Sequence, residues 1–121
     1  MIEYRLARKE DFPDVLEIEN LCFKDPYKKE DLEYEFEKNP VNKIIVAVSD
    51  NKVVGFIDFL ITFNSATIMQ VAVRNECRRQ GIATKLLEEM TKSFPTKSLI
   101  ASFAVLITSL ISEKVLYKRP A

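Results

Sequence analysis

The segment CRRQGIAT, residues 77–84, has the residue types and spacing of an anion-binding loop. Gly81 is one of only two glycines in the 121-residue chain. The first N–H groups of a helix have no partner within the helix, and the helix dipole favours a negative charge there. Because glycine has no Cβ, a phosphate group can approach the backbone closely, and Arg78, Arg79 and Lys85 add positive charge. The segment predicts either an ordinary strand-to-helix turn or a phosphate cradle.

The pattern differs from two common phosphate-binding loops. A Walker A loop needs GxxxxGK[ST], and a dinucleotide-binding loop needs GxGxxG. This chain has Arg78-x-x-Gly81-x-Ala83, directly after a predicted strand that ends in VAV. The six-residue pattern alone is weak, but a strand before it and an amphipathic helix after it favour the phosphate cradle.

Residue types missing from the chain exclude several kinds of site. The chain has no histidine, so Ser-His-Asp catalysis, Cys-His catalysis and histidine-containing zinc sites are excluded. Its two cysteines, Cys22 and Cys77, cannot form a four-cysteine site and are predicted to be free thiols. Cys77 lies beside two arginines, but we interpret it as incidental. We predict no metal site.

The composition predicts a single soluble domain over residues 1–121. Hydrophobic residues make up 47% and charged residues 30%, and the formal net charge is zero, which argues against a general nucleic-acid binder. Charges interrupt the first ten residues, so we expect no signal peptide, and the apolar run 98–111 is too short for a typical membrane span. We therefore expect a cytoplasmic protein that binds neither nucleic acid nor membrane directly.

Hydrophobic periodicity predicts the elements that position the loop. Apolar residues at helical spacing and a buried face at Leu86, Leu87, Met90 and Phe94 indicate a helix after the loop, with Lys85, Glu88, Glu89 and Lys92 facing water. Asp11 is the expected cap of the first helix, and Pro13 lies in its first turn. The predicted strands are 2–6, 43–48, 52–63, 66–73 and 98–107, and the predicted helices are 10–23, 28–38, 83–94 and 109–119. This order predicts an α/β (α+β-like) fold with a mixed central sheet flanked by helices.

Three segments carry a resemblance to a known family. QVAVRNECRRQGIATKLLEEM, residues 70–90, resembles the acetyl-CoA-binding motif of the GNAT N-acetyltransferases, with Ala83 where the family often has glycine. IENLCFKDPYKKEDL, residues 18–32, is similar to the start of the branch that acetylates N-terminal amines, which includes ribosomal-protein alanine acetyltransferases. VAVSDNKVVGFIDF, residues 46–59, looks like the hairpin that follows. The resemblance covers residues 2–92 well and the rest poorly.

The resemblance implies a pose for acetyl-CoA. The backbone of Val71, Ala72 and Val73 would pair with the pantetheine arm like an added strand, and the Val73 amide is the implied donor to the oxyanion. Phe23, Pro26 and Tyr27 would shape the acceptor site, although core packing beside a turn explains them as well. The implied pyrophosphate site comprises Arg78 and the amides of Arg79, Gln80, Gly81, Ile82, Ala83 and Thr84.

The C-terminal part departs from the family pattern. The family implies a glutamate base on the strand after the cofactor helix, but residues 98–107 contain no carboxylate. Leu116-Tyr117 can be aligned with the family's Leu-Tyr pair, which makes Tyr117 a candidate acid; its alternative is a half-buried aromatic on a helix. The tail KRPA stands where Gly-Phe is expected, so we expect the sheet to lack its last strand or strands. A frameshift or deletion after Phe94 is one hypothesis, which resequencing of the gene tests.

One carboxylate outside the loop is a second catalytic candidate. Asp58 interrupts the apolar run VVGFIDFLI, and its alternative is an outward-facing position on an alternating strand. Glu76 and Glu113 are expected to be solvent-exposed.

The sequence predicts an N-acetyltransferase that acts on the α-amine of a protein N-terminus, such as that of a ribosomal protein. Deprotonation at pH 7 costs about 1 to 1.4 kcal/mol for an α-amine and about 4.6 kcal/mol for lysine, so a site without a strong base serves an α-amine more easily. Two alternatives stay open: a non-catalytic CoA-binding or partner-binding domain, and a small-molecule (polyamine) acetyltransferase attracted by the acidic run EDLEYEFE. The expected partners are acetyl-CoA and a peptide acceptor, with the chain a monomer or a dimer.

Overall fold

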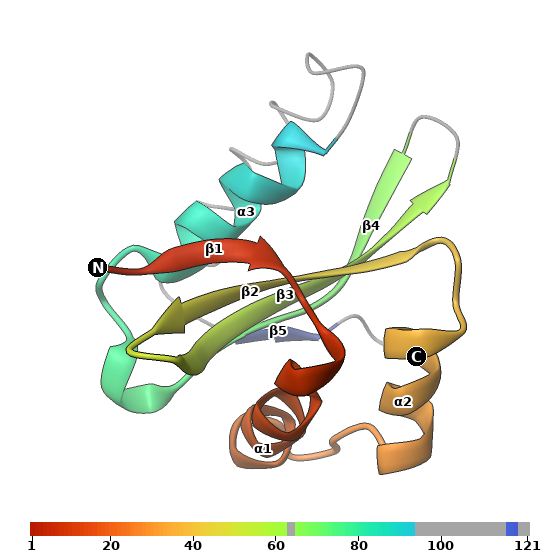
Figure 1. Cartoon of the computed structure of the whole chain (residues 1–121), viewed down its shortest axis with the longest axis horizontal. Helices are drawn as coiled ribbons and strands as arrows, with labels where there is room; N and C mark the ends of the chain where they lie inside the picture. The colour runs from red at the N-terminus through yellow and green to blue at the C-terminus, as the bar shows by residue number, and fades with distance from the viewer. Residues whose placement is uncertain (63–64, 94–115, 119–121) are drawn as a thin grey trace.

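The structure is a computed structural model of the whole chain (Figure 1). It describes the backbone of residues 1–62, 65–93 and 116–118, and the side chains of residues 1–61 and 67–93. The predicted strand 98–107, most of the predicted helix 109–119, Phe94 and Glu113 lie outside the described residues.

The described strands form one sheet in the order of the chain. They are β1 (Glu3–Leu6), β2 (Asn42–Ser49), β3 (Lys52–Thr62), β4 (Ser65–Val73) and β5 (Leu116–Lys118), in the spatial order β1-β2-β3-β4-β5. The first four confirm the predicted strands. All four pairings are antiparallel, so the parallel pair that a mixed sheet requires is not among the described strands. The helix predicted for 109–119 is wrong at its end, because residues 116–118 pair with β4 instead.

The helices begin and end close to the predicted positions. They are α1 (Phe12–Cys22), α2 (Lys29–Glu37) and α3 (Ile82–Lys92), with short 3-10 turns η1 (Lys9–Asp11) and η2 (Asn75–Cys77). Pro13 lies in the first turn of α1, as predicted. Asp11 is the N-cap residue of α1, as predicted, but its side chain makes no capping hydrogen bond to the helix. Its carboxylate instead accepts two hydrogen bonds from the Arg5 guanidinium, at 2.7 and 3.0 Å, and one from the Arg8 amide at 2.7 Å.

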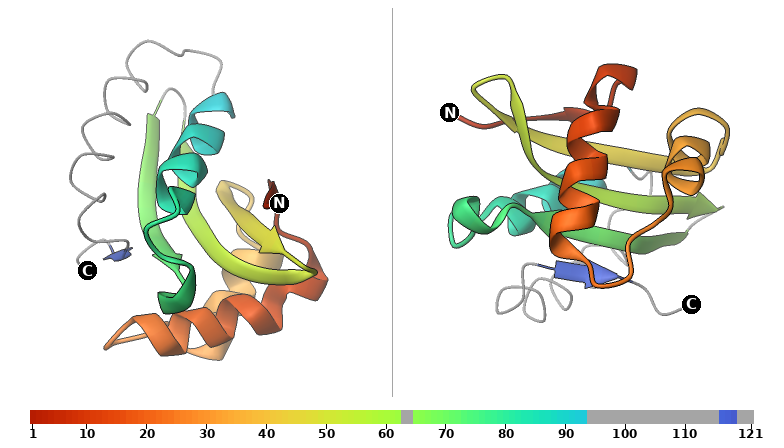
Figure 2. Two further views of the ribbon diagram at one scale, coloured as in Figure 1. Left: turned by 90° about the vertical axis from the view of Figure 1, so that its left-hand side faces the viewer. Right: turned by 90° about the horizontal axis from the view of Figure 1, so that it is seen from below.

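Helices cover both faces of the sheet. Figure 2 shows α1 and α2 on one face and α3 on the other. Each face has its own apolar core, because successive strand residues point to opposite sides. Leu86, Leu87 and Met90 form the buried side of α3, as predicted. The core on the other face contains Val15, Ile18, Leu32, Ile44, Val46, Val53, Phe56 and Ala72.

A β-bulge interrupts the pairing of the two longest strands. Asp58 lies opposite Gln70, but Phe59 lies opposite Ile68, so Met69 has no partner on β3. Bulges increase the local twist and re-aim the neighbouring side chains, and they are frequent beside functional sites. The bulge therefore marks the Asp58–Gln70 pair for closer inspection.

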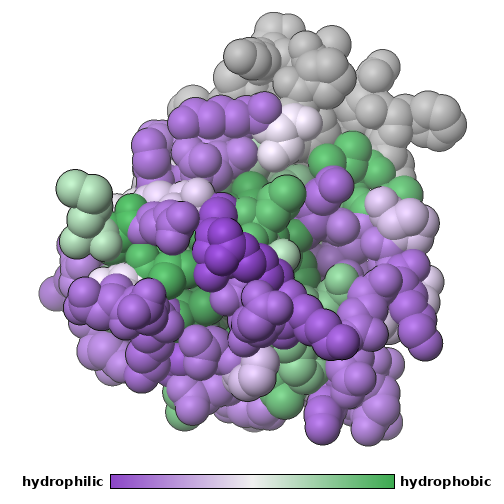
Figure 3. All heavy atoms as spheres, viewed as in Figure 1, coloured by the Kyte–Doolittle hydropathy of each residue, from purple (hydrophilic) through white to green (hydrophobic). Residues whose placement is uncertain are grey.

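The surface is largely polar on the face shown in Figure 3, with hydrophobic residues exposed between charged ones. Among the described residues, no helix has the length and apolar character needed to cross a membrane.

Candidate functional site: an amide cradle and a buried carboxyl

The N-terminus of α3 presents backbone N–H groups that have no partner among the described residues. The first hydrogen bond of the helix runs from the Lys85 amide to the Gly81 carbonyl at 3.0 Å, and no side chain caps the helix. The amides of Ile82, Ala83 and Thr84 are therefore free donors. Gly81 has φ of 76° and Arg79 has φ of 67°, so the chain turns twice through the left-handed region before the helix. Successive amides in such turns form concave anion sites.

Space around Gly81 fits the same interpretation. A Cβ built on Gly81 meets no heavy atom within 4 Å, so the backbone is open on that side. Packing within the protein therefore does not require glycine here. The positive φ favours glycine, and open backbone with free donors suits a phosphate.

The three basic side chains near the cradle, Arg78, Arg79 and Lys85, differ in their contacts and exposure. Arg78 is tied to the protein, because its Nε donates to the Val73 carbonyl at 3.0 Å and its Nη1 donates to Asn75 Oδ1 at 3.2 Å. Arg79 is exposed, and Lys85 is half-exposed and ion-paired with Glu88 at 3.6 Å. Arg78 thus holds the loop onto β4, while Arg79 and Lys85 remain closer to solvent.

Strand β5 lies along the edge of β4 that the sequence predicts for the pantetheine arm. Val71 lies opposite Tyr117, and Ala72 lies opposite Leu116. Val73 is beyond this pairing. An arm paired with Val71 and Ala72 therefore needs β5 to leave that edge. The helical alternative for Tyr117 is wrong, since Tyr117 is in a strand; its role as an acid stays a prediction.

Asp58 is buried, and the predicted outward-facing alternative is wrong. Its exposure is 1%, and neither carboxylate oxygen has a hydrogen-bond partner. Burial raises the pKa of Asp58 to about 7, and the negative charges of Glu35 and Glu19 add to the rise. The Asn42 amide opposes the rise, although its Nδ2 donates to the Glu35 carbonyl at 3.3 Å. A carboxyl with a pKa near neutrality can exchange a proton at physiological pH.

A second buried carboxylate fixes the loop between α1 and α2. Glu19 is fully buried, and its Oε2 accepts hydrogen bonds from Gln70 Nε2 at 2.8 Å and from the Tyr27 amide at 3.0 Å. Phe23 and Tyr27 pack against the core of this face, and Pro26 is half-buried. Burial, followed by the nearby charge of Asp58, raises the pKa of Tyr27 to about 12. The predicted acceptor residues therefore lie on the same face as Asp58.

Residues Glu19, Gln70, Glu35, Asn42 and Arg74 were not predicted as site residues. A sequence pattern could have identified two of them as buried polar residues. Glu19 lies four residues after Val15 on the buried side of a helix, and Gln70 interrupts the apolar run IMQVAV.

Arg74 anchors the end of β4 beside the cradle. It is 4% exposed, and its Nε donates to the Val53 carbonyl at 2.9 Å while its Nη1 pairs with Glu17 at 2.5 Å. Its guanidinium therefore fastens α1 to the strand from which the cradle emerges.

The remaining residues considered in the sequence analysis are the two cysteines and Glu76. Both cysteines are free, and Glu76 is exposed, as predicted. Within the described ranges, no group of three or more His, Cys, Asp or Glu side chains is placed to hold a metal ion.

Comparisons with known proteins agree with this geometry. A protein of Bacillus subtilis (strain 168), named for alanine N-acetylation of ribosomal protein bS18, is 30% identical over 82 residues, which are 68% of this chain and 54% of that protein. The ribosomal-protein-S18-alanine N-acetyltransferase of Escherichia coli has a TM-score of 0.70 at 19% identity, over 77% of this chain and 59% of that one. Arabidopsis thaliana NAA60, crystallised with a bisubstrate analogue, has a TM-score of 0.68 at 20% identity, over 77% of this chain and 66% of that one. The PaiA N-acetyltransferase of Thermoplasma acidophilum, crystallised with coenzyme A, has a TM-score of 0.67 at 23% identity, over 77% of this chain and 71% of that one.

The chain thus spans about half the length of the curated relative that it matches. The sequence pattern of the Acetyltransferase (GNAT) family matches residues 12–114. With this match over most of its length, the chain belongs to the GNAT acetyltransferase family.

Proposed function

We propose that this chain transfers the acetyl group of acetyl-CoA to an amine, namely the α-amine of a protein N-terminus. The observation that carries the proposal is the row of free amides at Ile82, Ala83 and Thr84, which follows the open backbone of Gly81. These donors, with Arg79 and Lys85 beside them, suit the pyrophosphate of coenzyme A. Solved relatives that contain coenzyme A or a bisubstrate analogue support this assignment.

The choice of acceptor rests on the relatives and on acid–base chemistry. Two relatives are named for acetylating an alanine of ribosomal protein S18. The pKa of an α-amine is about 2.5 below that of lysine, so less free energy is needed to deprotonate it. Ribosomal proteins occur in the cytoplasm, and the proposal places this chain there as well.

The chain's own residues would act mainly by positioning the reactants. The amides of the cradle bind the pyrophosphate, and the end of β4 at Val73 orients the thioester. The family-implied role of the Val73 amide is to donate to the oxyanion that develops when the amine attacks. The loop that Glu19 fixes through Tyr27 closes the acceptor side. Holding the two reactants in line is worth several kcal/mol of the barrier.

The test uses the purified chain, acetyl-CoA and three acceptors: an alanine-initiated peptide, an N-acetylated peptide with one lysine, and spermidine. Release of free thiol reports turnover, and the melting temperature reports acetyl-CoA binding. We expect turnover with the alanine-initiated peptide to exceed turnover with the other two. Preference for spermidine would support the small-molecule alternative. The absence of any acetyl-CoA-dependent stabilisation at high concentration would contradict the proposal.

One observation favours a second candidate function, a non-catalytic CoA-binding domain. Strand β5 pairs with Val71 and Ala72, two of the three residues predicted to pair with the pantetheine arm. With β5 in place, coenzyme A held by the amide cradle could not lay its arm along β4 in the pose that transfer requires. Stabilisation by acetyl-CoA without turnover of any acceptor would support this candidate.

A further inference from the structure

Four buried oxygen atoms on the α1/α2 face of the sheet accept no hydrogen bond. They are Asp58 Oδ1 and Oδ2, Asn42 Oδ1 and Gln70 Oε1. Gln70 lies directly opposite Asp58, and Asn42 lies diagonally across from it on β2. Buried polar atoms without partners are rare in folded proteins, and each calls for an explanation. Here all of them are acceptors, so the missing partner is a donor.

From this pattern we propose that Asp58, Gln70 and Asn42 receive the primary ammonium group of the acceptor, and that Asp58 takes its proton. A primary ammonium has three N–H donors and one positive charge, which matches a carboxylate and two carboxamide oxygens. Asp58 is 1% exposed and Gln70 is fully buried, so the groups are held by packing before a ligand arrives. This inference rests on the proposed function and names the residues that select its substrate.

Negative charges on the two helices of this face favour a cation at this point. Glu19 contributes from α1 and Glu35 from α2, and both act on Asp58. Tyr27 lies on the loop between these helices, and the charge of Asp58, after burial, raises the pKa of its phenol. Burial also raises the pKa of Glu35. Gln70 on β4 and Asn42 on β2 are neutral. No cation from the described residues pairs with Asp58.

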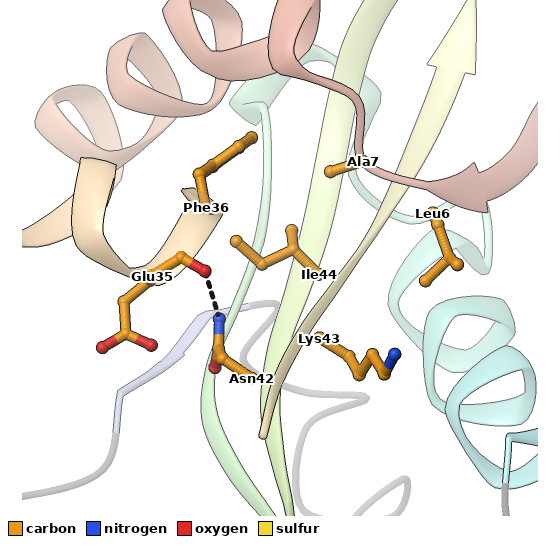
Figure 4. A pocket seen from close by; sticks show the side chains of 7 residues that line it. All are labelled: Leu6, Ala7, Glu35, Phe36, Asn42, Lys43 and Ile44. Carbon is orange, nitrogen blue, oxygen red and sulfur yellow. Dashed lines mark hydrogen bonds between the residues drawn. The ribbon is translucent and has the colours of Figure 1, made fainter. Parts of the chain in front are cut away.

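A cavity lies on the same side of the sheet, next to the neighbours of Asp58 on β2, although Asp58 itself does not line it. The cavity has a volume of about 190 Å³. Figure 4 shows the side chains that line it, from α2, β2 and the end of β1. Glu35 and Asn42 line it, as does Ile44, the cross-strand partner of Asp58. The dashed line in Figure 4 marks the bond from Asn42 Nδ2 to the Glu35 carbonyl at 3.3 Å.

The position also suits the transfer step. The cradle follows the C-terminal end of β4, and a cofactor arm paired with Val73, Ala72 and Val71 would run along this strand in the direction of Gln70. Asp58 lies opposite Gln70. An amine held at Asp58 would thus lie on the strand next to the one that holds the cofactor arm.

The proton balance is simple. The ammonium group gives one proton to the Asp58 carboxylate and becomes a neutral amine. Its nitrogen attacks the thioester carbonyl, so that a C–N bond forms and the C–S bond breaks. The departing thiolate takes the second proton that the nitrogen loses, and Asp58 releases its proton to solvent. The products are an amide, a free thiol and one proton.

The test separates amine recognition from acetyl-CoA binding. Binding of an alanine-initiated peptide and of its N-acetylated form is measured without acetyl-CoA by calorimetry, for the wild type, Asp58→Asn and the control Asp50→Asn. Asp50 is an exposed aspartate in the β2–β3 turn. We expect the wild type and the control to prefer the free amine at least tenfold, and Asp58→Asn to lose this preference. Asp58→Asn should keep acetyl-CoA-dependent stabilisation while kcat/KM falls about 100-fold or more.

Equal binding of both peptides to the wild type would overturn the proposal, even if the variant failed to fold. Stabilisation by NaCl or CaCl2 as strong as by the free-amine peptide would overturn it as well, because it would assign the oxygens to an inorganic cation. A wild type without acetyl-CoA binding but with the amine preference would contradict the proposed function and leave the ammonium site standing.

Discussion

Oε2 of Glu19 accepts a hydrogen bond from Nε2 of Gln70 at 2.8 Å, across 51 residues of sequence. The same oxygen accepts a bond from the Tyr27 amide at 3.0 Å. One carboxylate thus connects α1, the loop after it and the central strand β4. Because Gln70 is also the cross-strand partner of Asp58, this bond fixes the Gln70 side chain beside the proposed ammonium site.

Removing this carboxylate should destabilise the fold more than making it neutral. In Glu19→Ala, Gln70 Nε2 and the Tyr27 amide lose their common acceptor, at about 1–3 kcal/mol for each buried donor. Glu19→Gln keeps an acceptor oxygen and should lose about 1 kcal/mol. Urea unfolding measures both variants. Equal losses in the two would show that the acceptor oxygen is not what stabilises the loop.

Wild-type stability should fall as pH rises from about 4 to about 7. The pKa of Asp58 is about 7 in the fold, because of burial and then the charge of Glu35, against its ordinary value of 3.8. In this window the folded chain binds more protons than the unfolded chain, so stability decreases with pH. A difference of about three between the folded and unfolded pKa values corresponds to at most about 4 kcal/mol of stability. Urea unfolding at a series of pH values measures the slope.

Asp58→Asn should flatten this slope and raise stability at pH 8, since an uncharged amide takes the place of a buried charge. Asp50→Asn, at an exposed turn position, should leave the slope unchanged. An Asp58→Asn variant with the wild-type slope would show that other groups cause the pH dependence.

Substitution of Gly81 separates backbone conformation from access to the cradle. Gly81→Val forces a β-branched residue to φ of 76°, at a cost of about 1–2 kcal/mol. Gly81→Asn adds a Cβ too, but asparagine tolerates this conformation. A Cβ meets no protein atom there, so any steric effect comes from the ligand. We expect both variants to lose acetyl-CoA-dependent stabilisation, and only the valine variant to lose intrinsic stability. Normal acetyl-CoA binding by the asparagine variant would mean that the phosphate does not approach Gly81.

The elements up to residue 92 could be predicted from sequence because local signals agree with tertiary packing there. Leu86, Leu87 and Met90 follow a helical period and are buried on one side of α3. The turn before β3 has Asp50 and Asn51 at positive φ, which both residue types tolerate. The cradle could be found because glycine and its flanking strand and helix are close in sequence.

Asp58 is a candidate from sequence, but the contacts within the buried polar cluster could not be predicted, because residues distant in the sequence form it. In the sequence, Asp58 occupies the position of an outward-facing residue on an alternating strand. It is buried only because helices pack over that face of the sheet. Glu19 and Gln70 meet only when α1 packs across β4. The prediction of a helix at residues 116–118 was wrong for a related reason. These residues pair with the edge of β4, and that pairing prevails over the helical spacing of their apolar residues.

Disrupting β5 should strengthen acetyl-CoA binding. Leu116 and Tyr117 pair with Ala72 and Val71, on the edge where the pantetheine arm is predicted to lie. Tyr117→Pro removes a backbone donor and disfavours strand pairing, so it should release this edge and lower the Kd for acetyl-CoA about fivefold or more. Tyr117→Phe is the matched control, because it keeps the strand and removes only the phenol; it should leave the Kd unchanged and lower kcat if Tyr117 is the acid. Calorimetric titration with acetyl-CoA decides the matter: an unchanged or higher Kd in Tyr117→Pro would mean that the strand and the cofactor do not compete for β4.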